Sequence, residues 1–216
     1  MPGEDPFRDF FHEVKPIRMK EPLAGTLGAF DREDAVLEYT FIETVKAAGH
    51  ACPTVTGAFL CCQAALETIY PDAIPERGNI AITVYGEPGE GALGVMAQVF
   101  TFITGAAPET GFKGLGPRFK RKDLLRFKPD ESGDEAASFH FERLDTGNAV
   151  VVKFHPWLIP YPEEKAKQLA RLMQLVVMGA ADADECREFQ NLWTDKIRAM
   201  VIEHEEIDNW LKVEAA

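Results

Sequence analysis

The sequence lacks several features that define common classes of protein. None of its apolar runs reaches the about 18 residues of a membrane-spanning helix, so we expect a chain that does not enter a bilayer. The opening residues, MPGEDPFRDFFHEVKP, do not show the basic-then-apolar pattern of a secretory signal peptide. There are only four cysteines, two of them adjacent, which do not form the disulfide framework of a secreted protein. Together these absences predict a cytoplasmic protein.

An excess of positive charge is also missing. The 216 residues carry a formal net charge of −12, so the protein as a whole is repelled by phosphate backbones and anionic membrane surfaces. The glycine spacing matches neither a P-loop nor a dinucleotide fingerprint, and no repeat or low-complexity tract occurs. We therefore expect no nucleic-acid and no membrane partner. The 46% of apolar and 27% of charged residues are typical of a soluble globular protein with a substantial core.

Hydrophobic patterning predicts an α+β fold, in which a mixed or antiparallel sheet packs against helices. Three parts are expected: an N-terminal arm with residues 1–30, an α+β core with residues 31–160, and a C-terminal helical segment with residues 161–216. The expected helices cover 32–48, 53–70, 92–105, 163–179 and 183–213. The expected strands cover 79–85, 124–127, 137–142 and 149–154.

One short segment, residues 47–57, puts an imidazole and a thiol at the break between two expected helices. Gly49 suits the position after the first helix, and Pro53 suits the first position of the second, which makes Cys52 its N-cap. His50 and Cys52 are two residues apart, so in an extended segment both side chains project to the same side. The partial positive charge of the helix end favours a thiolate. The pair suits zinc or another transition metal, or a Cys/His nucleophile pair; the alternative is a buried capping cysteine beside a histidine bonded to backbone.

Other thiols and imidazoles are further candidate ligands. Cys61 lies nine residues along the second helix from Cys52, about 13 Å away at the α-helical rise, so one ion cannot bind both, and Cys62 is expected in the core. His140 and His155 belong to the expected hairpin and are candidates for a third ligand, although lone histidines are more often structural. The Cys52-Pro53 dipeptide also occurs in some haem-binding segments, which makes haem a weaker candidate.

A glycine-bearing basic stretch covers residues 111–128 and contains seven Lys or Arg against one Asp. Its glycines would let backbone amides approach an anion, and its side chains would hold that anion. The candidate side chains are Lys113, Arg118, Lys120, Arg121 and Lys122. The alternative is that the stretch is a solvated surface.

The corner itself is distinctive. Gly49-His50-Ala51-Cys52-Pro53, followed by Gly57 in the next helix, resembles the Gly-His-x-Cys-Pro-Gly corner of the FmdE-like family, which is named after a component of formylmethanofuran dehydrogenase. Looser similarities over roughly residues 32–213 lie in Thr104-Gly105, in the Gly111 to Gly116 stretch, and in the late helix that carries Phe189, Leu192, Trp193 and Ile197.

This resemblance implies an α+β domain, often dimeric, that holds zinc or a related ion near His50 and Cys52. The third family thiol would fall near Ala106, so the ion would lack a ligand or take it from His140, His155, a partner chain or an exogenous molecule. The implied function is a homodimeric metal- or cofactor-binding protein. Two alternatives stay open: an enzyme that uses Cys52 as a thiolate with His50 as its base, and an accessory component of a redox complex.

Overall fold

The structure, a computed structural model, describes residues 6–31, 35–129 and 135–216. Its main sheet has five strands in the order β6-β3-β7-β8-β9, and only the β3–β6 pair is parallel. These strands are β6 (Leu125–Lys128), β3 (Ile80–Tyr85), β7 (Ala137–Arg143), β8 (Ala149–Phe154) and β9 (Leu211–Ala215). The mixed sheet packs against helices, so the expected α+β class is confirmed.

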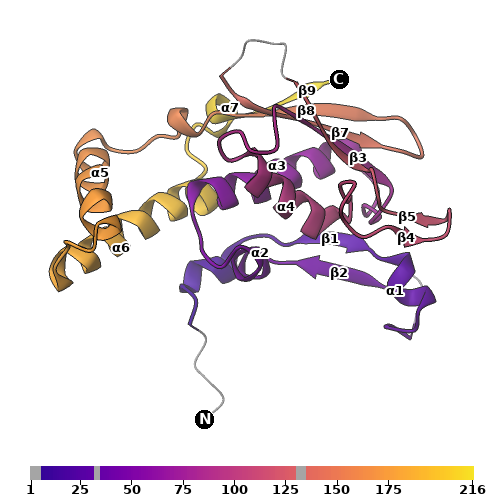
Figure 1. Cartoon of the computed structure of the whole chain (residues 1–216), viewed down its shortest axis with the longest axis horizontal. Coiled ribbons are helices and arrows are strands. Elements are labelled where there is room, and N and C mark those ends of the chain that lie inside the picture. The colour runs from indigo at the N-terminus through magenta and orange to yellow at the C-terminus, as the bar shows by residue number, and fades with distance from the viewer. Residues whose placement is uncertain (1–5, 32–34, 130–134) are drawn as a thin grey trace.

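Two helices cover one face of this sheet: α3 (Pro53–Ile69) and α4 (Leu93–Thr104). Phe139 and Phe141 of β7 point toward them, and their rings meet that of Phe100 edge-on at centroid distances of 4.9 and 5.1 Å. On the other side of the helices lies a two-stranded sheet with α2 beside it (Figure 1). These elements are β1 (Ile17–Lys20), β2 (Val36–Tyr39) and α2 (Phe41–Ala48). The core therefore lies between two layers of sheet.

The N-terminal segment is part of this body. A short turn, Asp9–Glu13, buries Phe10 and Phe11 in the main core, and α1 (Pro22–Thr26) follows β1. The helix expected over 32–48 was wrong in its first half: residues 32–34 lie outside the described part, and 36–39 form β2. Helix α2 instead begins after Thr40, because Thr40 and Glu43 form a capping box.

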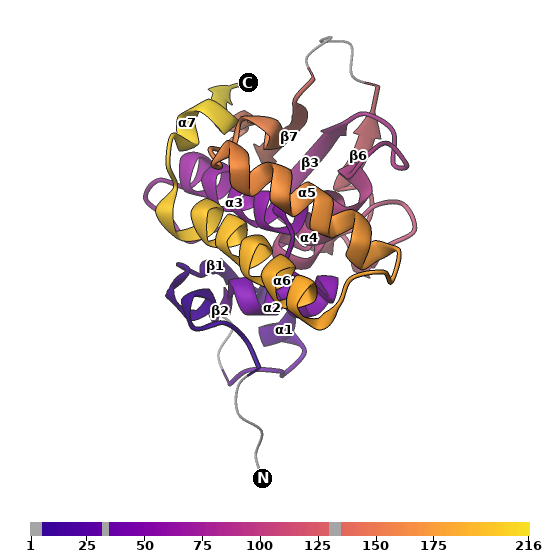
Figure 2. The same cartoon turned by 90° about the vertical axis from the view of Figure 1, so that its left-hand side faces the viewer.

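The C-terminal segment begins with the helices α5 (Glu163–Val177) and α6 (Ala183–Arg198), which pack on each other and project from the body (Figures 1 and 2). The second expected helix, 183–213, was too long. After a π-turn at Ala199–Glu203 the chain takes left-handed conformations at His204 and Glu206, then forms α7 (Ile207–Trp210) and β9. The helix ends there because Trp210 is fully buried and the residues after it pair with β8.

The remaining expected elements match α3, α4, β3, β6, β7, β8 and α5 to within a few residues. The basic stretch also contains a short hairpin, β4 (Gly114–Leu115) with β5 (Phe119–Lys120), and a 3-10 turn at Pro156–Leu158 follows β8. Across the described ranges, no helix is both long enough and apolar enough to cross a membrane.

Candidate functional site

Helix α2 ends and helix α3 begins at this corner where the sequence predicts. Helix α2 ends at Ala48, and Gly49 takes a left-handed conformation with φ of 77°. Cys52 is the N-cap of α3, where its Sγ accepts a hydrogen bond from the backbone N–H of Val55 at 3.4 Å. Pro53 occupies the first helical position. A sulfur atom therefore stands at the positive end of a helix 17 residues long.

His50 is exposed and Cys52 is half-buried, so solvent molecules reach both residues. The Nδ1 atom of His50 lies 3.1 Å from the carbonyl oxygen of Ala48. Because a carbonyl oxygen only accepts, this bond assigns the proton of the neutral ring to Nδ1 and leaves the lone pair on Nε2. Nε2 is then the nitrogen that could bind a metal or accept a proton.

Two distant elements fix the corner in place. The indole Nε1 of Trp193, on α6, donates a hydrogen bond to the carbonyl oxygen of Ala51 at 2.8 Å. One turn into α3, Gly57 packs on the ring of Phe154 from β8, and a Cβ at that position would meet a ring carbon at 2.4 Å. Only a glycine allows α3 to approach β8 so closely. The glycine of the resemblance therefore has a packing role in this chain.

A cavity of about 330 Å³ opens beside the first turn of α3. Thr54, two residues after Cys52, forms part of its wall. Aromatic side chains from the sheet and from the 3-10 turn form other parts: Tyr85, Phe154 and Trp157. Glu90 and Glu135 add carboxylates to the lining. The corner is thus adjacent to a space large enough for a small organic molecule.

The two histidines considered as third ligands lie in different surroundings. His140 is on β7 between Phe139 and Phe141, so its side chain leaves the sheet on the face opposite to α3 and the corner. Burial lowers the pKa of His140 below its ordinary value of 6.5, with Lys128 acting in the same direction and Glu142 against it. The described structure therefore separates His140 from Cys52 by the thickness of the sheet.

His155 follows β8, at the end of the molecule that holds the cavity, since Phe154 and Pro156 on either side of it both line that space. Its ring packs edge-on against Trp157 at a centroid distance of 5.5 Å. Within residues 6–31, 35–129 and 135–216, no three His, Cys, Asp or Glu side chains are grouped as metal ligands. The imidazole and the thiol at the corner are chemically suited to zinc. The described residues, however, do not group the three or four ligands that a protein zinc site uses.

Helices α3 and α4 run side by side in the same direction. Their first turns line one cavity, through Thr54 and Leu93. Beyond their last turns, residues 78–79 are hydrogen-bonded to both helices. The N–H of Gly78 donates to the carbonyl of Thr104, and the carbonyl of Asn79 accepts from the hydroxyl of Tyr70. At the α-helical rise, the 17 residues of α3 span about 25 Å between these two ends.

Ala106, where the resemblance would place a third thiol, follows the C-terminal end of α4 and is fully buried. Cys52 lies at the N-terminal end of α3. The two positions are therefore at opposite ends of the helix pair. A single ion could not join them within this chain, whatever residue stood at 106.

The basic stretch divides into exposed and buried side chains. Lys113, Arg118 and Lys120 are exposed, and the guanidinium of Arg118 lies 4.9 Å from the ring centroid of Phe119. Arg121 is only 2% exposed and pairs with Glu21, with 2.6 Å between Nη2 and Oε1. The structure thus corrects the role expected of Arg121: it holds an internal carboxylate, and its place is inside the protein rather than on a surface that binds anions.

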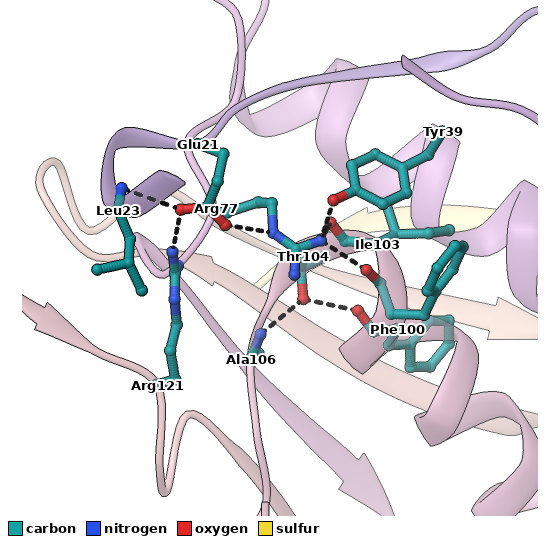
Figure 3. A network of polar contacts seen from close by, with 10 residues as sticks. Glu21, Leu23, Tyr39, Arg77, Phe100, Ile103, Thr104, Ala106 and Arg121 are labelled. Atoms are coloured by element: carbon teal, nitrogen blue, oxygen red, sulfur yellow. Dashed lines mark hydrogen bonds and ion pairs between the residues drawn. The ribbon is translucent and has the colours of Figure 1, made fainter. Parts of the chain in front are cut away.

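Arg121 belongs to a buried network of polar contacts (Figure 3). Glu21 accepts from Arg121 with one carboxylate oxygen and from the Nε of Arg77, at 2.8 Å, with the other. Arg77 also donates to the carbonyls of Phe102 and Ile103, at 2.6 and 2.8 Å, and to the hydroxyl of Tyr39. Burial lowers the pKa of Arg121 while Glu21 acts against that shift. Sequence reasoning missed this network because Glu21 and Arg121 are 100 residues apart.

The four cysteines also fall into two groups. Cys61 and Cys62 are fully buried on α3, and burial raises the pKa of both thiols. Cys52 and Cys186 are half-buried, and all four are free. The exclusion of Cys61 and Cys62 as ligands beside Cys52 agrees with their positions further along the same helix.

Comparison of the sequence with protein-family models gives no match. A search of curated proteins likewise gives none. Inferences about function therefore rest on the geometry of the corner and on the sequence resemblance.

Proposed function

We propose that this chain is a metal- or cofactor-binding protein similar to the FmdE-like family, with its ligand held at His50 and Cys52. The observation that carries the proposal is the sulfur of half-buried Cys52 at the N-terminus of α3, two residues before Thr54, which lines a cavity. The Cys52 sulfur caps the N-terminus of α3, and the Ala48 carbonyl directs the lone pair of His50 to Nε2. Thiolate and imidazole are both zinc ligands.

His50 and Cys52 give an ion two ligands from one chain, so further ligands are needed to complete its coordination. In the proposal these come from the bound cofactor or from a second copy of the chain, which agrees with the homodimer expected from the resemblance. The α5–α6 hairpin offers a surface for such contact, since Val177 and Met178 at its turn are 73% and 80% exposed. A partner within a redox complex would use the same kind of apolar contact. The free cysteines are consistent with a reducing, cytoplasmic compartment.

The test is the metal content of untagged protein, measured by plasma mass spectrometry on the intact chain. His50→Ala and Cys52→Ala are each expected to lose most of the bound metal. Cys186→Ala is the matched control, because Cys186 is also a half-buried free thiol but lies on α6. Equal metal content in all four proteins would exclude the corner as the metal site. Light scattering on the same samples measures whether the chain is a dimer.

The second candidate is an enzyme in which the Cys52 thiolate is the nucleophile and His50 Nε2 accepts its proton. The adjacent cavity favours it, since a substrate held there would lie within a helical turn of the sulfur. Alkylation by iodoacetamide, followed residue by residue by mass spectrometry against pH, separates the two candidates. Rapid reaction of Cys52 at neutral pH in metal-free protein supports the enzyme. A Cys52 that reacts only after a chelator is added supports the metal site.

A further inference from the structure

A second and larger cleft, of about 970 Å³, runs along the side of α4. On the helix it is lined from Gly94 to Thr101, two turns or about 10 Å. The opposite walls are the loop 108–111 and the edge strand β6, from which Leu125 and Phe127 line the cleft. The cavity beside the corner is lined instead by Leu93 and Met96 of the same helix. The two spaces thus use different faces of α4.

The lining of this cleft is largely apolar with a few polar groups, as in sites for small organic ligands. Pro88, Ala97, Pro108, Leu125 and Phe127 supply apolar surface. Gln98, Thr101 and Thr110 supply polar side chains, and none of these three side chains makes a hydrogen bond to another described residue. They are therefore available as donors and acceptors to a ligand.

The charged side chains of the cleft bear on the kind of ligand that it would bind. Lys120 and Arg126 line it, and neither forms an ion pair with any residue in the described ranges. Glu109 and Asp123 line it as well, but the surrounding stretch 111–128 holds seven Lys or Arg against one Asp in a protein of net charge −12. Of these seven, only Arg121 is neutralised internally, by Glu21, as far as the described residues show. Lys120 and Arg126 are thus cations without an ion-pair partner among the described residues, and they would attract an anionic group.

The basic wall is also held rigidly before any ligand arrives. The backbone of Arg121 accepts from the N–H of Ala107 at 3.0 Å and donates to the carbonyl of Lys113 at 3.1 Å. Leu125 donates its N–H to Ala107 at 3.2 Å, which ties β6 to the loop. The buried pair of Arg121 with Glu21 fixes this unit to the core beside Lys120. A wall fixed in this way loses little conformational entropy on binding.

From these observations we infer that the cleft binds a small amphipathic anion, with an apolar body along α4 and β6 and a phosphate or carboxylate group at Lys120 and Arg126. Gln98 and Thr101 of α4, and Thr110 of the loop, orient its polar atoms. This site is separate from the His50–Cys52 corner and does not depend on the function proposed there.

The test uses the aromatic sulfonate 8-anilinonaphthalene-1-sulfonate as a fluorescent probe on the full chain. Saturable binding is expected, and the combined change Lys120→Glu and Arg126→Glu is expected to weaken it at least about tenfold, since each charge-assisted contact is lost. Thr101→Phe, which fills the cleft from α4, is expected to weaken it similarly. Circular dichroism and thermal melting of each variant establish that it is folded.

Two controls separate this site from the rest of the surface. Lys212→Glu changes an exposed lysine on β9, the strand at the other edge of the sheet, and is expected to leave the affinity unchanged. The double variant His50→Ala, Cys52→Ala is also expected to bind the probe with wild-type affinity. The metal-content test of the corner and the probe test of the cleft can therefore fail separately. Equal probe affinity in folded wild type, Lys120→Glu/Arg126→Glu and Thr101→Phe would overturn the assignment.

Displacement of the probe identifies the anionic group. Competition by adenosine monophosphate but not adenosine assigns a phosphate, and competition by decanoate but not decanol assigns a carboxylate. Both results support the inference. Equally effective displacement by the neutral compounds would contradict the requirement for an anion.

Discussion

The His50–Cys52 corner and the cleft along α4 differ in how visible each is in the sequence and in how many groups the fold gathers there. The corner is a run of neighbouring residues with a distinctive order, yet the described structure gathers no third metal ligand around it. The cleft draws its lining from segments between Pro88 and Phe127, and only its basic part stands out in the sequence. A motif thus locates donor atoms, whereas the fold decides how many groups surround a ligand.

The two regions also differ in what holds them. The corner depends on close packing, at Gly57 against Phe154, and on one hydrogen bond from Trp193. The wall of the cleft depends on a buried ion pair between Glu21 and Arg121. Substitutions that remove one kind of support should therefore disturb one region and spare the other.

The largest effect is expected from Glu21→Ala. It leaves Arg77 and Arg121 buried without their shared carboxylate, and loss of one partner of a buried ion pair costs about 3–5 kcal/mol. Urea denaturation should show this loss in the free energy of unfolding, and probe binding in the cleft should weaken. The control Glu67→Ala removes the exposed pair with Lys15 and should cost at most about 1 kcal/mol. Similar values for both variants would show that the buried network does not support the fold.

A smaller loss is expected from Gly57→Ala, which puts a methyl group 2.4 Å from the Phe154 ring. Overpacking of this kind costs about 1–3 kcal/mol and should push the first turn of α3, and Cys52 with it, away from β8. Thermal melting measures the loss, and the rate of Cys52 alkylation measures the displacement. Gly89→Ala, at a site with open space around the added atom, should leave both unchanged. Probe binding in the cleft should change little in either variant.

The smallest effect concerns pH. Because burial lowers the pKa of His140 in the folded protein, the unfolded chain takes up a proton more readily once the pH falls below about 6.5. The contribution of His140 to stability is therefore complete above that pH and is lost progressively below it. Urea denaturation between pH 8 and 5 should show a weaker pH dependence for His140→Gln than for wild type. Equal pH dependences for wild type and His140→Gln would contradict this account.

Local signals explain which elements the sequence could predict. Pro53 and Gly49 marked the ends of α3 and α2 correctly, because their backbone preferences act within a few residues. The end of α6 was missed, because the turn at His204 and Glu206 is stabilised by the burial of Trp210 and by pairing with β8. Arg121 was expected to bind an external anion, and its internal partner was missed because Glu21 is distant in sequence and only the fold brings the two together.

The hydrogen bond from Trp193 to Ala51 gives the corner an optical signal of its own. Indole emission changes when the hydrogen bond at Nε1 is altered, so occupation of the corner would shift the fluorescence of a side chain on α6, without any attached label. The same bond means that α6 experiences any movement of the Ala51 backbone directly. The projecting C-terminal hairpin is thus mechanically connected to the residues between α2 and α3.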